Sequence, residues 1–254
     1  MYSDLTGKNV LITGSNGLVG RALASTFSLQ GANLYLHAHS WNTENSSWID
    51  TLSHKPSYLL EADLSDSRSI ISMFSTLKGQ VDCIDILINN ACIQDLQSIE
   101  ETTDEFLDRM TSIDLHAPIL CTSAMAKQVR RAKEKKQRSI IHILSIEAEN
   151  PAILHSQYGA MKGGLLQFMR ASALELGPLD IRVNGISPGV IYRENITEEW
   201  PDGTRRYIES SPLHTLISAE DVADAALFLA SDAASKITGI NLRVDAGIGV
   251  TTGY

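Results

Sequence analysis

The sequence predicts a single α/β domain built on a doubly wound, seven-stranded parallel sheet. Short, fully apolar runs alternate with segments of helical period along all 254 residues. Strands that are apolar on both faces and separated by helices are typical of parallel sheets covered on both sides. Hydrophobic residues make up 43% of the chain, which is enough for a sizeable core, and we find no internal repeat or linker.

Seven runs are interpreted as strands because they are short, apolar and bounded by polar or turn-forming residues. The longest helical segment covers about residues 103–133, and another helix begins at about residue 156. Segment 39–54 is poorly patterned and is expected to hold a short helix. The expected strands cover residues 9–12, 34–37, 58–61, 84–88, 139–144, 181–186 and 241–244. The other expected helices cover about residues 17–30, 66–77 and 219–230.

One long irregular connection, from Pro188 to Pro212, follows the sixth expected strand. Connections of this length in a compact domain are usually functional, often as a lid. We therefore expect one nucleotide-binding domain over residues 1–254, with a substrate loop at about residues 188–215.

Composition excludes several classes of function. A net charge of −9 argues against a general binder of nucleic acid or anionic membranes. The cysteines Cys83, Cys92 and Cys121 form no C-x-x-C pair, which argues against a disulfide framework or a metal cluster. No apolar run approaches the ~20 residues of a membrane helix, and no leader pattern precedes the first strand. We expect a soluble, reduced, cytoplasmic protein without nucleic-acid, membrane or metal partners.

A glycine-rich turn, Thr13-Gly14-Ser15-Asn16-Gly17-Leu18-Val19-Gly20, joins the first strand to the first helix. Gly14 permits a tight turn, Gly17 lets the backbone approach a phosphate, and Gly20 lets the helix lie close to the sheet. The start of the helix then offers unpaired amides to a pyrophosphate. A turn without a ligand is the alternative, but the position between strand and amphipathic helix favours a dinucleotide.

The end of the second strand selects the type of dinucleotide. An acidic residue there would bind the adenine ribose and repel a 2′-phosphate. The residues present are Ala38, His39, Ser40 and Trp41, none of which is a carboxylate. This predicts NADP as the preferred cofactor, with NAD as the alternative because no arginine is present. His39 would otherwise be an ordinary exposed loop residue.

Tyr158 and Lys162 are four residues apart, so they share one face of a helix. Ser145 follows the apolar run 139–144 and therefore lies at the carboxyl end of a strand. A free phenol has a pKa of about 10, and a nearby lysine cation can lower it by roughly 1–3 units. With a serine to hydrogen-bond a substrate oxygen, this is a proton-transfer arrangement. The alternative is a tyrosine packed beside a solvated lysine.

Together these motifs resemble the short-chain dehydrogenase/reductase family over essentially the whole chain. The resemblance implies a Rossmann-like sheet, a nicotinamide cofactor, and hydride transfer between the cofactor and a carbonyl or alcohol. Five motifs occur in the family's order: the glycine turn, Asp63-Leu64, Asn89-Asn90-Ala91, the Ser145/Tyr158/Lys162 set and Pro188-Gly189.

The resemblance also implies roles for individual residues. Tyr158 would be the general acid/base, Lys162 would lower its pKa and bond the nicotinamide ribose, and Ser145 would orient the substrate oxygen. Asp63 and Leu64 would contact adenine, while Asn89 would help to hold the strands. The residues expected to bind the cofactor are Gly14, Ser15, Asn16, Gly17, Leu18, Val19, His39, Asp63, Leu64, Asn90, Ala91, Tyr158, Lys162, Pro188, Gly189 and Ile191. The residues expected to bind the substrate are Ser145, Glu147, Gln94, Tyr192 and Arg193.

Two departures from the family pattern affect the cofactor side. The middle glycine of the compact, single-domain branch is expected at Leu18 but stands at Gly17. This spacing is similar to that of the extended branch, which includes sugar-nucleotide epimerases. Cys92 replaces the usual glycine after Ala91, which would narrow the pocket on the nicotinamide side.

Two further departures affect the proton and the substrate. Asp114 stands where the family's fourth catalytic residue, an asparagine, is expected. Its charge would offset the effect of Lys162 on Tyr158, unless Asp114 only caps backbone at a helix kink. Arg193 replaces a threonine that usually bonds the carboxamide; it could bind an anionic group or be an ordinary exposed arginine.

The sequence thus predicts an NADP-preferring oxidoreductase that reduces a ketone or aldehyde, or oxidises the alcohol. One alternative is a sugar- or sugar-nucleotide-linked oxidoreductase of the same family, suggested by Gly17 and by the loop arginines Arg193, Arg205 and Arg206. A second is a low-activity cofactor-binding sensor or scaffold, suggested by Asp114 and Arg193. The resemblance implies a homodimer or homotetramer, formed through the helices that start near Thr103 and Ser156.

Overall fold

The computed structural model describes residues 2–250 and contains one seven-stranded sheet with strand order β3-β2-β1-β4-β5-β6-β7. All six strand pairings are parallel, as predicted. The strand order reverses between β1 and β4, which is the point where doubly wound sheets bind their ligands. The strands are β1 (Asn9–Ile12), β2 (Asn33–Ala38), β3 (Tyr58–Glu61), β4 (Ile86–Asn89), β5 (Arg138–Ile143), β6 (Ile181–Pro188) and β7 (Asn241–Val244).

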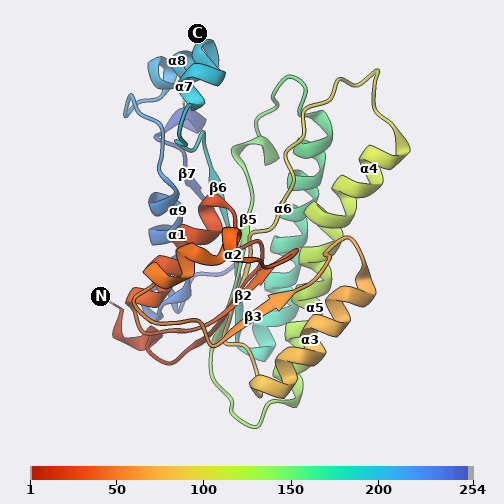
Figure 1. Ribbon diagram of the computed structural model, residues 1–254, viewed down its shortest axis with the longest axis vertical. Helices are drawn as coiled ribbons and strands as arrows, with labels where there is room; N and C mark the ends of the chain where they lie inside the picture. The colour runs from red at the N-terminus through yellow and green to blue at the C-terminus, as the bar shows by residue number, and fades with distance from the viewer. Residues whose placement is uncertain (1, 251–254) are drawn as a thin grey trace.

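Helices cover both faces of the sheet (Figure 1). Successive residues of a strand point to opposite faces. Leu11 therefore packs in one core, with residues of α3, α5 and α6, while Val10 and Ile12 pack in the other, with residues of α1 and α9. The helices are α1 (Leu18–Leu29), α2 (Thr43–Ser46), α3 (Ser67–Gln80), α4 (Asp104–Thr111), α5 (Ala117–Arg131), α6 (Ser156–Leu176), α7 (Ile196–Glu199), α8 (Pro201–Ser210) and α9 (Ala219–Ala230).

The expected helix over 103–133 is interrupted, which corrects the sequence prediction. A π-helical turn, Ser112–His116, separates α4 from α5 and contains Asp114. Pro118, near the start of α5, has no N–H to donate to the carbonyl of residue 114, four positions earlier. The missing bond favours a locally widened helix, and such bulges occur often at functional sites.

The connection after β6 also differs from the prediction of an irregular stretch. It contains the short helices α7 and α8, which lie together at one end of the molecule (Figure 1). Asn195 precedes α7 with a left-handed backbone (φ 63°), and Pro201 starts α8. No helix in the described part of the chain is long and apolar enough to cross a bilayer.

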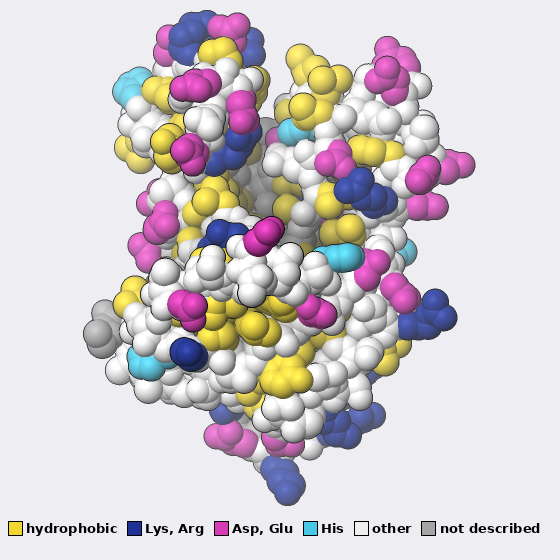
Figure 2. All heavy atoms as spheres, viewed as in Figure 1, with side chains coloured by type: hydrophobic (Ala, Val, Ile, Leu, Met, Phe, Trp, Pro, Cys, Tyr) yellow, Lys and Arg dark blue, Asp and Glu magenta, His cyan; other side chains and the backbone are white. Residues whose placement is uncertain are grey.

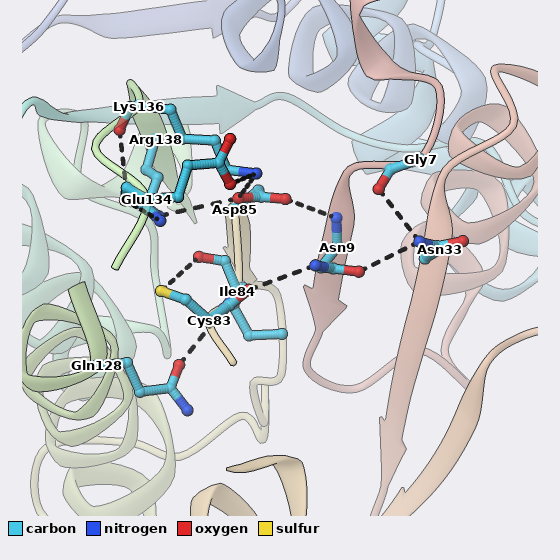
Figure 3. Close-up of polar contacts among 10 residues, drawn as sticks. All are labelled: Gly7, Asn9, Asn33, Cys83, Ile84, Asp85, Gln128, Glu134, Lys136 and Arg138. Carbon is cyan, nitrogen blue, oxygen red and sulfur yellow. Dashed lines mark hydrogen bonds and ion pairs between the residues drawn. The ribbon is translucent and has the colours of Figure 1, made fainter. Parts of the chain in front are cut away.

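A buried ion cluster joins the amino-terminal ends of the central strands (Figure 3). Asp85 Oδ2 accepts the N–H of Asn9 at 3.0 Å, and Asp85 Oδ1 lies 3.1 Å from Lys136 Nζ and 3.8 Å from Arg138 Nε. The side chains of Asp85 and Arg138 are each 2% exposed. The cluster links the starts of β1, β4 and β5 at the edge opposite the candidate site.

Candidate active site

The carboxyl ends of the parallel strands meet at one edge of the sheet, below a notch in the surface (Figure 2). One side of the notch is formed by the segment that carries α7 and α8. The other side is formed by the loops that follow β4 and β5 (Figures 1 and 2). Ser145, Tyr158 and the glycine turn all lie at strand ends or helix starts on this edge. The tertiary fold therefore brings both ends of the predicted site together.

The glycine turn is held against the end of β4. Gly14 has φ +63°, and a Cβ placed on it would lie 2.7 Å from the Cα of Ala91. The Asn90 side-chain amide donates to the carbonyls of Thr13 and Gly14, each at 3.0 Å. Asn90 therefore holds the shape of the turn with its side chain, and Ala91 forms the wall beside it.

A buried histidine that the sequence analysis did not identify supports the same turn. His37 Nδ1 accepts the N–H of Gly14 at 3.2 Å, and Nε2 lies 3.0 Å from the carbonyl oxygen of Ala62. Because an amide can only donate, Nδ1 is the acceptor and Nε2 carries the hydrogen. Burial lowers the pKa of His37 to about 4, so the ring is neutral at pH 7. No local pattern distinguishes such a histidine from other strand residues.

The space in front of α1 fits a dinucleotide pyrophosphate. Among the described residues, no side chain caps the N-terminus of α1, so its first amides face open space. The nearest heavy atom to a Cβ on Gly17 would be Gly14 O at 3.6 Å, so protein packing does not require a glycine there. An exposed glycine before an uncapped helix leaves room for a phosphate against the backbone.

The adenine side contains the predicted residues and one unexpected carboxylate. Leu64 is buried, whereas Asp63 accepts two hydrogen bonds from Ser65, which lower the pKa of Asp63. His39 is exposed at the end of β2. Glu61, on the neighbouring strand, accepts the N–H of Trp41 through Oε1 at 2.7 Å. The segment 38–41 contains no acidic residue, but the fold places a carboxylate beside it.

Lys162 lies one helical turn after Tyr158 on α6, with its Nζ 5.4 Å from the centre of the phenol ring. The ammonium donates to the carbonyl of Ile143 at 3.2 Å, and the residue is 2% exposed. Ser145 Oγ accepts the N–H of Glu147 at 3.1 Å, which leaves the hydroxyl hydrogen free for another acceptor. The lysine is therefore a buried cation rather than the solvated one of the alternative interpretation.

Two opposing effects act on the pKa of Tyr158. Burial raises the pKa of the Tyr158 phenol to about 12, while Lys162 acts in the opposite direction. The charges of Asp114 and Glu147 add to the rise. Lys162 therefore acts in the predicted direction, but desolvation of the phenolate outweighs the attraction of the cation, so the pKa of Tyr158 is raised overall.

Two alternatives were considered for Asp114, an electrostatic effect on Lys162 and Tyr158 and a cap on the backbone, and both apply. Its Oδ1 accepts the N–H of Ile93 at 2.8 Å, which holds the loop after β4. Its Oδ2 has no hydrogen-bond partner within residues 2–250. Burial raises the pKa of Asp114 to about 6, and Lys162 opposes this rise. The carboxyl group therefore braces backbone and also lies within the electrostatic reach of Lys162.

A second pair of polar side chains lies beside Tyr158. His155 Nδ1 is 2.9 Å and 2.8 Å from the two carboxylate oxygens of Glu147, and the His155 and Tyr158 ring centres are 5.7 Å apart. Sequence analysis identified Glu147 but missed His155. The two residues are eight positions apart on an irregular loop, so no helical or strand period relates them.

Most of the remaining predicted residues lie on the segments that follow β4 and β6. Gln94, Tyr192 and Cys92 are exposed residues, although burial around the Cys92 thiol raises its pKa. Arg193 forms an ion pair with Glu199. Arg205 pairs with Asp202 and Glu209, so these two loop arginines already have acidic partners. Near the glycine turn, Asn16 Oδ1 accepts from Trp48 Nε1 at 2.7 Å, and Ser15 Oγ donates to the carbonyl of His37 at 2.9 Å.

The last predicted cofactor residues border the substrate loop. Gly189 donates its N–H to Val244, next to the end of β6 at Pro188. Ile191 forms a single parallel bridge with Ile217. These contacts hold the start of the loop against the sheet and against the segment that follows the loop.

Comparison with known proteins agrees with this geometry. A family model described as "Enoyl-(Acyl carrier protein) reductase" matches residues 15–249. Glucose 1-dehydrogenase 2 of Bacillus subtilis (strain 168) is 27% identical over 252 residues, covering 98% of this chain and 97% of that protein. D-xylose 1-dehydrogenase of Caulobacter vibrioides is 30% identical over 250 residues, covering 97% and 98%.

A solved structure is similar over the full length. The crystal structure of a putative short-chain alcohol dehydrogenase from Sinorhizobium meliloti 1021 superposes with a TM-score of 0.90 at 26% identity, covering 99% of this chain and 100% of that one. Together with the seven-stranded sheet and the residues at its carboxyl edge, these matches lead to one conclusion. The chain belongs to the short-chain dehydrogenase/reductase family and is an NAD(P)-dependent oxidoreductase that acts on alcohols or their carbonyl counterparts.

Proposed function

We propose that the protein interconverts a ketone or aldehyde with its alcohol, using Tyr158 as general acid/base and preferring NADP. The observation that carries this proposal is the buried Lys162 ammonium. It lies 5.4 Å from the centre of the Tyr158 ring and donates to the carbonyl of Ile143 at the end of β5. Burial of a cation costs free energy unless a negative charge that develops nearby offsets this cost. A phenolate formed during proton transfer is such a charge.

In the reductive direction, the Ser145 hydroxyl donates a hydrogen bond to the substrate oxygen and holds it near the phenol. When bound, the nicotinamide supplies the hydride that adds to the carbonyl carbon. The electron pair of the C=O π bond moves to oxygen, and the Tyr158 hydroxyl gives that oxygen its proton. Lys162 stabilises the phenolate that remains until solvent protonates it. Alcohol oxidation follows the same steps in reverse.

Asp114 tunes this proton transfer in the proposal. Its carboxylate lies within the electrostatic reach of both Lys162 and Tyr158, and it raises the pKa of each. The Asp114 side chain also accepts the Ile93 N–H, so it positions the loop that follows β4. The other members of the proposed catalytic set are Ser145, Tyr158 and Lys162.

The preference for NADP rests on the open end of β2. His39 is exposed there, and segment 38–41 has no acidic side chain that would repel a 2′-phosphate. The nearby Glu61 carboxylate accepts the Trp41 N–H. Its negative charge would repel a 2′-phosphate, and salt screens this repulsion. NAD is the alternative cofactor.

The test is a Tyr158→Phe variant, with cofactor binding as the control. Turnover should be lost in Tyr158→Phe, while the thermal shift on adding NADPH stays within about 1 °C of the unmodified protein. Saturating cofactor at 100 times its Kd stabilises by about 2.7 kcal/mol, which for this size raises Tm by roughly 5–10 °C. Turnover that survives the substitution would contradict the assignment of Tyr158 as general acid/base. No shift with either NADPH or NADH would favour a non-catalytic scaffold.

A sugar-linked oxidoreductase is the second candidate. The relatives named for glucose and D-xylose favour it, and so does the glycine spacing at Gly17. We also propose a homodimer or homotetramer formed through α4, α5 and α6, on which the apolar side chains of Leu107, Leu120 and Leu174 are exposed. Light scattering at micromolar concentration tests the assembly, and a monomeric mass contradicts it.

A further inference from the structure

Glu147 and His155 form a polar pair that the proposed reaction does not use. We propose that this pair forms hydrogen bonds with a second hydroxyl group of the substrate. The preferred substrates are then neutral polyhydroxylated compounds (aldoses, ketoses or polyols) rather than hydroxy acids or simple alcohols. This inference rests on the proposed function and names the substrate class of the same site.

The pair touches both groups that would hold the substrate oxygen. The backbone N–H of Glu147 donates to Ser145 Oγ at 3.1 Å. The ring centre of His155 lies 5.7 Å from that of Tyr158, with the rings tilted by 56°. A substrate whose reacting oxygen lies between Ser145 and Tyr158 therefore places its neighbouring carbons beside the pair.

The burial of the pair makes it a discriminating site. The side chains of Glu147 and His155 are each 14% exposed, so a ligand atom can reach them although most of their surface is already out of water. Polar groups in such a setting are costly to leave without a partner. A site built to bond a substrate hydroxyl therefore rejects an analogue that lacks it more strongly than an apolar pocket rejects an extra group.

The hydrogen-bond polarity of the pair favours hydroxyl groups. Because a carboxylate only accepts, the contacts of 2.9 Å and 2.8 Å place a hydrogen on Nδ1 of His155 and leave Nε2 for a ligand. The Glu147 carboxylate needs donors. A hydroxyl group both donates and accepts, so it can bond the carboxylate and Nε2.

Charge at the notch disfavours an anionic substrate. The Glu147 carboxylate would repel a carboxylate or phosphate placed next to the reacting carbon. Across the notch, Arg193 is paired with Glu199, and Arg205 is paired with Asp202 and Glu209. Arg193 and Arg205 therefore already have acidic partners.

The experiment compares three substrate classes with the full-length protein and NADP⁺ or NAD⁺. The panel contains neutral aldoses and polyols, 3-hydroxybutyrate as the anion, and cyclohexanol as the simple alcohol. We expect the best neutral polyol to exceed both others in kcat/KM by about tenfold or more. Glu147→Gln and His155→Gln should lower this ratio by about 10- to 100-fold, because kcat/KM for the polyol falls, mainly through KM, much further than kcat/KM for cyclohexanol does.

Glu149→Gln is the matched control. It removes a carboxylate two residues further on, which pairs with Arg243 at 2.8 Å instead of with His155. The polyol to cyclohexanol ratio should stay unchanged in this variant. Thermal unfolding of all three variants identifies any loss of folded protein.

Each outcome separates this inference from the proposed function. Turnover of cyclohexanol or 3-hydroxybutyrate as efficient as that of every polyol overturns the inference and leaves the proposed function intact. An unchanged ratio in folded Glu147→Gln and His155→Gln overturns it too. Absence of turnover with all three classes overturns the proposed function, and the inference falls with it.

Discussion

The Gly14 N–H donates to His37 Nδ1 at 3.2 Å, which ties the glycine turn to the end of β2. His37 also donates from Nε2 to Ala62, immediately before Asp63. One neutral ring thus connects the segment expected to bind the pyrophosphate with the segment expected to contact adenine. Its burial makes it sensitive to acid.

We predict that acid weakens the protein through His37. Its pKa is about 4 when folded and about 6.5 when unfolded, so the unfolded chain takes up the proton first. Stability is therefore complete above about pH 6.5 and is lost as the pH falls toward 4, by roughly 3 kcal/mol for this residue. Buried His142, whose pKa is lowered to about 3, acts in the same direction.

Urea unfolding at pH 7.5 and 4.5 measures the effect. In His37→Asn, which can still accept from Gly14 and donate to Ala62, the loss between the two pH values should be smaller by about 2 kcal/mol. Equal losses in the two proteins would show that His37 does not carry the acid sensitivity.

A second prediction concerns Asp114→Asn. The amide keeps an oxygen to accept the Ile93 N–H but removes the charge that raises the pKa of Tyr158. We expect the basic pKa in the pH profile of kcat/KM to move to lower pH. An inflection near pH 6, from the Asp114 carboxyl group itself, should disappear. A profile that is identical in the two proteins would place Asp114 outside the proton transfer.

A third prediction separates two glycines of the turn. Gly17→Ala should fold normally, within about 0.5 kcal/mol, because the nearest heavy atom to its Cβ lies at 3.6 Å, yet the dinucleotide Kd should rise about tenfold or more. Gly14→Ala should lose more than about 1 kcal/mol of stability, since its φ is +63° and its Cβ would lie 2.7 Å from Ala91 Cα. Calorimetry measures both quantities. Unchanged cofactor affinity in Gly17→Ala would exclude the proposed phosphate position.

A fourth prediction tests the carboxylate beside β2. Glu61→Gln keeps an oxygen to accept the Trp41 N–H but removes a negative charge from the proposed 2′-phosphate region. Affinity for NADPH should rise severalfold relative to NADH, with a larger change at low salt. Fluorescence titration of both cofactors provides the ratio. If the ratio stays constant, Glu61 lies beyond the reach of the 2′-position.

A fifth prediction concerns the ion cluster at the opposite edge. Asp85→Ala leaves Arg138 buried without its carboxylate, and such losses cost about 3–5 kcal/mol. The exposed pair of Arg205 and Glu209 serves as the control, because Glu209→Ala should cost less than about 1 kcal/mol. Denaturant unfolding compares the two. Asp85→Ala combined with Arg138→Met should recover part of the loss, and a double variant weaker than the single one would contradict this account.

Several elements of this protein follow from the sequence by itself. The bounds of β1, β3, β7 and α9 match the prediction, because the extent of a strand or an amphipathic helix is encoded in the local pattern of apolar residues. The relation of Tyr158 to Lys162 is equally local, since residues four apart on a helix share a face. The order of strands and helices then restricts the topology to a doubly wound sheet.

Other features depend on contacts between distant segments. His37 meets Gly14, Glu61 reaches Trp41, and Glu147 meets His155 only after the strands pair and the loops close over their ends. The pKa of Tyr158 likewise depends on burial, which here outweighs the nearby cation. Local periodicity determined which elements form, whereas desolvation and long-range pairing, which no short stretch of sequence encodes, decided how the polar groups of the site act on one another.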